Sequence, residues 1–302
     1  MNRKIVITGA TGLIGKRLAR ELIDEGNRVT VVSRSVEKAK KLIPHAVNYV
    51  GWNYENEPAD FVEGQDIIVH LMGENIMSKR WTDKHKQVVY NSRIKSTRKI
   101  VEGIKRASHK PALFLHSSAI GFYGIGNFEV DDYSPKGTGF LSDLVDDWEN
   151  EAKKVEEACI RKVSVRLGIV LDKNEGALKR MILPYKLFIG GPLGSGKQWF
   201  PWISIEDAAG IFKFAMDNQN ISGAFNAVSP GVINMKEFSK SLGDVLQRPS
   251  LFRVPAYILK LVLGEAADAL IFGVRASSKK LMENGYKFEY SSIKPALKSI
   301  LK

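Results

Sequence analysis

The sequence predicts an α/β protein with a Rossmann-like, doubly wound parallel sheet and a smaller C-terminal substrate lobe. Three observations support this fold class. Strand-type and helix-type segments alternate through the first half of the 302 residues, as they do in parallel sheets. A glycine-rich turn separates the first strand from the first helix. Residues 184–202 then become rich in Gly, Pro and Trp, which indicates a change of architecture.

The elements follow from short apolar runs and longer amphipathic segments. Strands are expected at residues 4–8, 28–33, 46–51, 66–72, 112–118 and 163–170. Helices are expected at residues 16–25, 36–42, 82–107 and 142–160. Later segments predict a loop at 184–202, a helix at 205–217, a returning strand at 224–228, a helix at 234–246 and two or three helices after 255. We therefore expect a Rossmann domain over 1–171 and 203–228, with a lobe over 172–202 and 229–302.

The first turn has the spacing Gly-x-x-Gly-x-x-Gly, formed by Gly9, Gly12 and Gly15. The first glycine permits a sharp turn, the second lets a pyrophosphate approach the backbone, and the third lets the helix pack closely on the sheet. Free N–H groups at the helix start favour phosphate charge. The turn therefore predicts a dinucleotide site that includes Thr11, Leu13 and Ile14, and the alternative is a tight turn without a ligand.

The end of the second expected strand indicates which dinucleotide binds. NAD sites usually carry Asp or Glu about 20 residues after the glycines, where it holds the ribose 2′-OH. This chain has Ser33, Arg34 and Ser35 there. A guanidinium can hold a 2′-phosphate with paired hydrogen bonds. We predict NADP(H), with Arg34 as a solvated loop residue in the alternative interpretation.

Composition narrows the class of protein. The net charge is +12, and residues 79–110 carry a local excess of nine positive charges, but no nucleic-acid-binding motif accompanies them, so no nucleic-acid partner is expected. The single cysteine, Cys159, fits a reducing compartment. The absence of an 18-residue apolar run predicts a soluble, cytoplasmic protein. The histidines lack metal-ligand spacing, so no metal is expected. The expected state is a monomer or homodimer, which no residue pattern decides.

Residues 191–197 match the Gly-x4-Gly-Lys core of a phosphate-binding P-loop. The next residue is Gln198 in place of the Ser or Thr that holds magnesium, and Pro201 opposes an immediate helix. Without a helix N-terminus the phosphate cradle is incomplete. ATP binding is therefore not expected.

Residues 8–15, TGATGLIG, resemble the TGxxGxxG motif of extended short-chain dehydrogenases/reductases. Further stretches resemble the serine-rich strand end, the sixth strand and the returning lobe segment of that superfamily, and they are residues 117–124, 165–170 and 199–208. The chain is most similar to its atypical "epimerase family protein" branch, which is NAD-dependent epimerase/dehydratase-like. The supporting residues are 70–76, 80–82, 91–93, 190–202, 263–265 and 285–288.

The resemblance implies a nicotinamide cofactor, an unknown small-molecule substrate and the small C-terminal domain of that branch at about 250–302. It also implies more cofactor-binding residues along the strand ends. These are Ser33, Trp52, Leu71, Met72, Gly73, Arg93, Ser117 and Gly168.

The superfamily works with a Ser or Thr, a Tyr, and a Lys four residues after the Tyr. Alignment of the motifs places these on Ala119, Phe140 and Leu144, none of which can transfer a proton. The phenol normally needs a lysine beside it to lower its pKa toward working pH. The resemblance therefore implies that the usual catalytic set is lost.

Nearby residues are candidate substitutes. We expect Tyr123, Ser118 and Glu74 to be the catalytic candidates, with Lys197 as a further nearby group. Each also has a structural interpretation, such as pocket lining, a strand-end hydrogen bond or an ion pair. Two hypotheses follow: an NADP(H)-dependent oxidoreductase or epimerase-like enzyme, or a non-catalytic NADP(H)-sensing binding protein.

Overall fold

The computed structural model describes residues 2–302. Its centre is a seven-stranded sheet with the order β3-β2-β1-β4-β5-β7-β11, in which every neighbouring pair is parallel. Its strands are β1 (Lys4–Thr8), β2 (Arg28–Ser33), β3 (Asn48–Gly51), β4 (Ile67–His70), β5 (Leu113–Ala119), β7 (Arg161–Leu167) and β11 (Gly223–Ala227). This strand order reverses beside β1, as in Rossmann folds, and confirms the predicted fold class.

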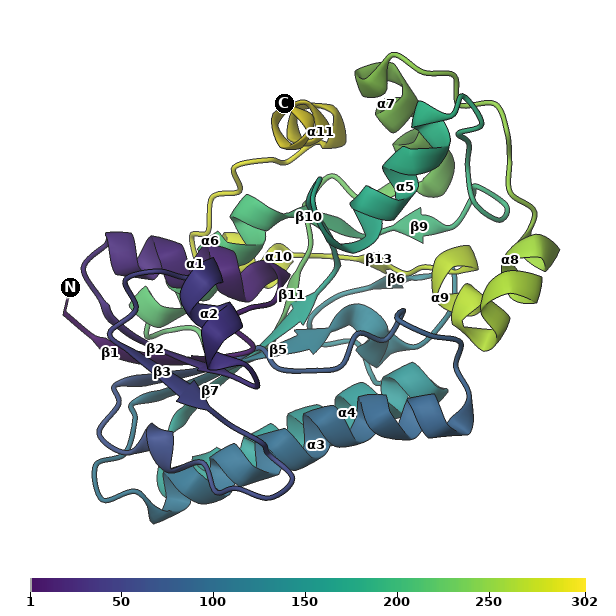
Figure 1. Ribbon diagram of the computed structural model, residues 1–302. Coiled ribbons are helices and arrows are strands. Elements are labelled where there is room, and N and C mark those ends of the chain that lie inside the picture. The colour runs from purple at the N-terminus through teal and green to yellow at the C-terminus, as the bar shows by residue number, and fades with distance from the viewer. Residues whose placement is uncertain (1) are drawn as a thin grey trace.

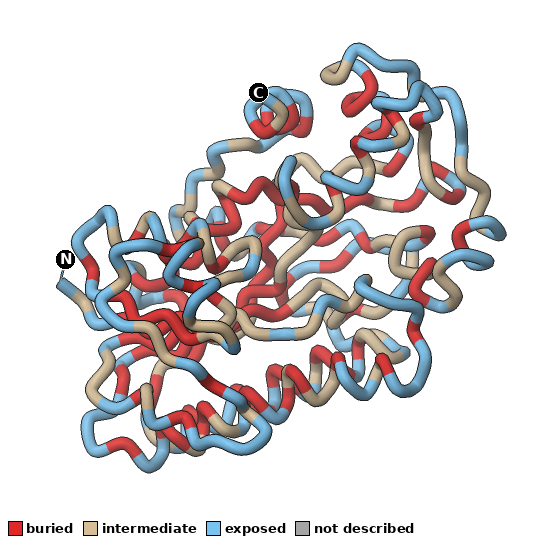
Figure 2. The backbone as a smooth tube through the Cα atoms, viewed as in Figure 1, coloured by how far each residue is buried: buried red, intermediate tan, exposed pale blue. Residues whose placement is uncertain are grey.

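Helices cover both faces of the sheet (Figure 1). One layer holds α1 (Leu13–Asp24) and α6 (Ile205–Asp217), which pack against each other. The opposite layer holds α3 (Asp83–Arg106) and α4 (Phe140–Lys153), which run parallel to each other, with Tyr90 bonded to Asp147 and Arg98 to Glu151. The short helix α2 (Val36–Leu42) follows β2 and is capped by Ser35. These layers hide both faces of the sheet, as the concentration of buried residues along the strands shows (Figure 2).

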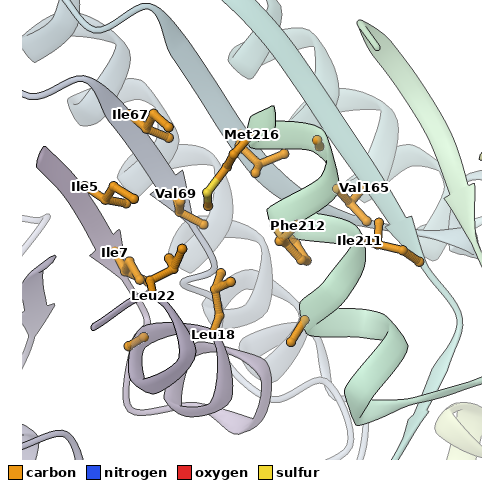
Figure 3. Close-up of a cluster of buried hydrophobic side chains, with 14 of the residues drawn as sticks. Ile5, Ile7, Leu18, Leu22, Ile67, Val69, Val165, Ile211, Phe212 and Met216 are labelled. Carbon is orange, nitrogen blue, oxygen red and sulfur yellow. The ribbon is translucent and has the colours of Figure 1, made fainter. Parts of the chain in front are cut away.

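The alternation of side chains along β1 explains the two-layer core. Ile5 and Ile7 pack with Leu18, Leu22 and Phe212 of the α1–α6 layer, and all five are fully buried (Figure 3). The intervening Val6 belongs to the cluster on the opposite face. Burying an aliphatic or aromatic side chain of this kind contributes about 1.5–3 kcal/mol, so β1 anchors both layers.

The second half of the chain adds a lobe beyond the strand ends (Figure 1). Its helices are α5 (Gly176–Lys186), α7 (Met235–Leu246), α8 (Ala256–Leu263), α9 (Asp268–Ile271) and α11 (Ile293–Leu301). The short helix α10 (Lys279–Glu283) packs instead against β11, and its Leu281 belongs to the core of the large sheet. The remaining strands are β6 (Glu129–Val130), β8 (Ile169–Leu171), β9 (Trp199–Phe200), β10 (Trp202–Ser204), β12 (Ile233–Asn234) and β13 (Arg275–Ala276). A separate apolar cluster, which includes Trp202, Phe238 and Leu297, forms the centre of this lobe.

Some element boundaries differ from expectation. The strand predicted at 163–170 is divided at Gly168, where an added Cβ would lie 2.5 Å from the Pro201 carbonyl oxygen. Helix α5 was not predicted, and it extends to Lys186 with Pro184 in its last turns, so the expected loop at 184–202 begins too early. The expected helix 142–160 is α4 followed by a 3-10 segment, Lys154–Ala158.

Asp207, buried at the start of α6, ties the C-terminal segment to the Rossmann core. Its carboxylate accepts hydrogen bonds from the Tyr286 hydroxyl at 3.1 Å and from the backbone N–H groups of Glu289 and Tyr290 at 2.8 and 3.1 Å. The Ser204 hydroxyl donates to the same carboxylate at 3.0 Å. One buried carboxylate thus holds the Ser204 hydroxyl that caps α6 and fixes the path of residues 286–290.

Candidate functional site

The glycine turn has the geometry that the sequence predicts. Gly9 adopts φ +68°, and a Cβ there would lie 2.7 Å from the Leu71 backbone. A Cβ on Gly15 would lie 2.5 Å from the Gly9 carbonyl oxygen, so both positions require glycine. Gly12 differs, because it is exposed, begins α1 without a side-chain cap, and would place a Cβ no closer than 3.2 Å to Gly9.

This arrangement leaves the start of α1 open to a ligand. The first N–H groups of a helix lack intrahelical partners, and no side chain caps those of α1. Thr11, Leu13 and Ile14 lie around the opening and are partly exposed. The residues present therefore fit a pyrophosphate group at this helix N-terminus.

The buried Arg93 of α3 holds the loop that follows β4 through hydrogen bonds to backbone carbonyl groups. The guanidinium donates to the Glu74 and Val89 carbonyl oxygens at 3.0 and 3.2 Å, and it packs against Gly73, where an added Cβ would approach it to 3.0 Å. Burial lowers the pKa of Arg93 to about 10, so it stays charged at neutral pH. Arg93 therefore fixes the segment that carries Leu71, which bonds back to the glycine-turn strand through Thr8.

The end of β2 presents an exposed guanidinium. Arg34 is exposed, and no carboxylate among residues 2–302 forms an ion pair with it. Ser33 accepts a hydrogen bond from the Ser35 N–H at 3.2 Å. Trp52 is only 4% exposed, packs edge-on against Phe61, and donates its own backbone N–H to the Ser33 carbonyl. Trp52 is thus a buried residue that packs at the end of β2, whereas the guanidinium of Arg34 is exposed and forms no ion pair.

Tyr123 lies inside the protein in a polar network. Its side chain is 1% exposed, and its hydroxyl donates to Asn226 Oδ1 at 2.8 Å and accepts from Arg166 at 3.0 Å. Arg166 makes two further hydrogen bonds of 2.8 Å to the Glu149 carboxylate. Ser118, also buried, donates to Glu149 at 2.5 Å. Burial raises the pKa of Tyr123, which makes its hydroxyl a weaker proton donor.

The network joins two predicted residues, Tyr123 and Ser118, through Glu149 and Arg166, which were not among the predicted site residues. An arginine within β7, an interior strand of the expected sheet, was the available indication, because a buried charge needs a partner. The partner lies on α4, 17 residues earlier, where nothing local distinguishes it from other acids of that helix. The arrangement supports a structural role for both hydroxyls.

The remaining predicted groups lie elsewhere. Glu74 is half-buried, and its backbone, not its carboxylate, makes the hydrogen bonds to Ser92 and Arg93. Phe140 begins α4 and packs edge-on against Trp81, while Leu144 is buried one turn later. Lys197 is exposed on the lobe. Neither Glu74 nor Lys197 takes part in the hydrogen-bond network that joins Tyr123 and Ser118.

Two cavities lie beyond the strand ends. The first, called here the strand-end cavity, has a volume of about 190 Å³ and is lined by Gly121 after β5, Gly168 after β7, and Phe272 of the lobe. The second, called the lobe chamber, has a volume of about 880 Å³ between α5 and α7. Met235 and Leu270 line both, so the two spaces adjoin.

The strand-end cavity is apolar. Of the residues that the structure describes, none with a carboxylate, amine, guanidinium, imidazole or phenol lines it. Tyr123, Ser118 and Glu74 are absent from the described lining of both spaces. Gly168 contributes only backbone atoms to the lining, because the close approach of Pro201 leaves no room for a side chain.

Two buried histidines underlie the site. His70 bonds Thr8 at 2.6 Å and Thr97 at 3.1 Å, and His116 bonds Ser164 at 2.7 Å. Burial lowers the pKa of each to about 3, so both are neutral at physiological pH. No group of three His, Cys, Asp or Glu side chains suited to a metal occurs within residues 2–302.

The basic stretch 79–110 largely forms α3 and pairs with acids. Arg98 contacts Glu151 at 3.1 Å, and Lys105 contacts Glu157 at 2.6 Å. These pairs bind α3 to the α4 layer. Helices of the described residues lack the combination of length and apolar character that crossing a bilayer requires.

The parallel sheet, the open helix N-terminus behind the glycine turn and the free guanidinium after β2 together define a Rossmann-like dinucleotide-binding protein. Comparison with known proteins then gives the family. Residues 5–139 match the model described as "NAD dependent epimerase/dehydratase family", and residues 254–300 match "Domain of unknown function (DUF1731)". This chain belongs to the NAD-dependent epimerase/dehydratase family, within the group called epimerase family proteins.

The relatives cover the whole chain. Epimerase family protein YfhF of Bacillus subtilis is 35% identical over 98% of this chain and 97% of its own length. The chloroplastic epimerase family protein SDR39U1 homolog of Arabidopsis thaliana is 36% identical over 98% and 86%. The crystal structure of human epimerase family protein SDR39U1 (isoform 2) with NADPH is 31% identical over 98% of both chains, with a TM-score of 0.88.

Proposed function

We propose that this protein binds NADP(H) and acts as an oxidoreductase or epimerase-like enzyme on a small molecule. The observation that carries the proposal is the end of β2, where an exposed, unpaired Arg34 stands in place of the carboxylate that holds a free ribose 2′-OH. A human relative that was crystallised with NADPH supports the same cofactor.

Different residues of this chain would bind different parts of the NADP(H) molecule. The N-terminus of α1 behind Gly12 would hold the pyrophosphate, and Arg34 would hold the 2′-phosphate. The segment from Leu71 to Gly73, braced by Arg93, would line the path between them and the strand ends. When bound, the nicotinamide group supplies hydride transfer. The apolar strand-end cavity would exclude water from that chemistry.

An enzyme of this kind also needs a proton-transfer group. We keep Tyr123, Ser118 and Glu74 as the candidate catalytic residues, and Glu74 is the least constrained because its carboxylate makes no ion pair within residues 2–302. The other two hydroxyls are buried and engaged. An approach of Glu74 to substrate would require only movement of its own side chain.

A second function is favoured by one observation. Because no titratable side chain among the described residues lines the strand-end cavity, the site lacks an evident proton donor. This supports a non-catalytic protein that senses NADP(H) and passes the bound state to a partner. Slow oxidation of NADPH by any member of a panel of carbonyl compounds would favour the enzyme over the sensor.

Titration calorimetry with NADPH and NADH tests the cofactor assignment. Arg34→Ala should weaken NADPH binding by about 1.5–3 kcal/mol, the range for a hydrogen bond to a charged group, and leave NADH affinity nearly unchanged. Arg28→Ala removes a guanidinium from the other end of the same strand and serves as the control. Equal losses for both cofactors in Arg34→Ala would contradict the assignment.

The pairing of α3 with α4 supports a further proposal, that the positive charge of residues 79–110 serves the fold and the cofactor and not a nucleic acid. We also propose a cytoplasmic monomer or homodimer. Binding of duplex DNA or RNA at physiological salt, with a steep salt dependence, would contradict the first of these.

A further inference from the structure

The lobe chamber is large enough for a whole ligand. Its volume of about 880 Å³ falls within the range of about 300–1,000 Å³ that is usual for small-molecule sites. It adjoins the strand-end cavity at Met235 and Leu270, so a ligand in the chamber can extend one end to the strand ends.

The chamber also adjoins the glycine turn. Gly176, at the start of α5, lines it, and an added Cβ there would lie 3.4 Å from Leu13 of α1. An ion pair between Glu175 and Lys16 holds the same two helix starts together. The chamber, the strand-end cavity and the dinucleotide turn are therefore parts of one continuous region.

The inner wall of the chamber is apolar. Met235, Phe238 and Leu242 of α7 face it together with Leu193 and Leu270. The two hydroxyl-bearing residues in the wall satisfy each other, because the Tyr185 hydroxyl bonds the Ser239 carbonyl at 3.0 Å and its hydroxyl at 2.5 Å. The α7 wall therefore offers an apolar surface whose hydroxyls are paired, which suits an apolar body, while the amides of Asn75 and Asn174 line the chamber elsewhere.

The charged groups gather at one edge. Lys179 and Arg180 lie on the exposed side of α5 and line the chamber, and neither forms an ion pair with a carboxylate of the described residues. Arg180 donates to the Met77 carbonyl oxygen at 3.1 Å, which fixes its guanidinium at the chamber edge. Glu175, the acid nearby, is neutralised by Lys16. The edge therefore has a positive charge available for an anion.

The solvent-exposed rim of the lobe chamber is also apolar. Leu183 and Ile189 line the chamber, and their side chains are 59% and 54% exposed. Exposed apolar side chains at the mouth of an apolar cavity give an apolar ligand a continuous path from solvent.

We propose that the lobe chamber binds an amphipathic substrate with a large apolar body and one anionic group, which Lys179 and Arg180 hold. The reacting end of this ligand would lie in the strand-end cavity, so the inference rests on the proposed function. Its binding does not depend on turnover, and the two proposals can therefore fail separately.

The test uses the full-length protein and 1-anilinonaphthalene-8-sulfonate, a fluorescent probe with an aromatic body and a sulfonate. We expect saturable binding by one probe molecule, displaced by dodecanoate and unaffected by UDP-glucose at the same concentration. The Lys179→Gln/Arg180→Gln double variant should lose at least fivefold in probe affinity. Lys186→Gln, an exposed change on the same helix outside the chamber lining, should stay within twofold.

A Gly12→Val variant separates the two proposals. It should no longer bind NADPH but should bind the probe as the unaltered protein does. Failure of the cofactor proposal would appear only in NADPH titrations. Displacement by UDP-glucose and not by dodecanoate would overturn the substrate class, as would unchanged probe affinity in the double variant or an absence of saturable binding.

Discussion

Replacement of Tyr123 by phenylalanine distinguishes a structural tyrosine from a catalytic one. The ring is retained, and only a hydroxyl that is bonded to Asn226 and Arg166 is lost. Asn226 Oδ1 then lacks its donor, and one Arg166 N–H lacks its acceptor, inside a region where water does not reach Tyr123. The bidentate contacts between Arg166 and Glu149 remain.

The magnitude follows from the groups left without partners. A buried donor or acceptor that loses its partner costs about 1–3 kcal/mol, and more where a charge is involved. We therefore expect Tyr123→Phe to lower the free energy of unfolding by about 2–3 kcal/mol. NADPH affinity should change little, because the hydroxyl does not face the glycine turn or either cavity.

Urea unfolding followed by tryptophan fluorescence measures this change. Tyr133→Phe makes the same chemical change at a side chain that is 80% exposed, and it should stay within about 0.5 kcal/mol of the unaltered protein. An equally small effect in Tyr123→Phe would refute the network as a source of stability. If turnover with an identified substrate then fell by about 10²–10⁴-fold, Tyr123 would be an acid–base residue after all.

Three further outcomes are expected. Gly12→Val should fold, since its Cβ approaches only the Gly9 carbonyl at 3.2 Å, yet abolish NADPH binding in calorimetry; normal binding would make the turn purely structural. Burial lowers the pKa of His70 and of His116 to about 3, so both should lower the free energy of unfolding as the pH falls from 6.5 toward 3. The loss should be up to about 1.4 kcal/mol per pH unit for each histidine, with none above pH 6.5. A free energy of unfolding that stays constant between pH 6.5 and 4.5 would contradict this. Asp207→Ala should increase hydrogen exchange at Glu289 and Tyr290 because it removes the acceptor for their backbone N–H groups, and unchanged exchange there would count against the tether.

Local patterns in the sequence were sufficient for the sheet and for the glycine turn that follows β1. A buried parallel strand is an unbroken apolar run, and a glycine that the backbone requires is needed whatever surrounds it, so β1, the turn at Gly9 and the exposed Arg34 followed from neighbouring residues. The same approach failed at α5, where Pro184 and the glycines after it suggested a loop. Pro184 lies in the last turn of α5, and the one intrahelical hydrogen bond that its missing N–H removes is the bond to the Arg180 carbonyl.

The tertiary structure alone decided which side chains meet. The Tyr123 hydroxyl contacts Asn226, 103 residues later, and Arg166 finds Glu149 on a different element. Tyr123 resembled a free phenol in sequence because its partners lie on strands that become neighbours only after β5, β7 and β11 pair. The lobe chamber has the same origin, since α5 and α7 face each other across a space to which each contributes only one wall. Residue type and spacing determine what a strand or turn can do, whereas burial and partnership are properties of the folded chain.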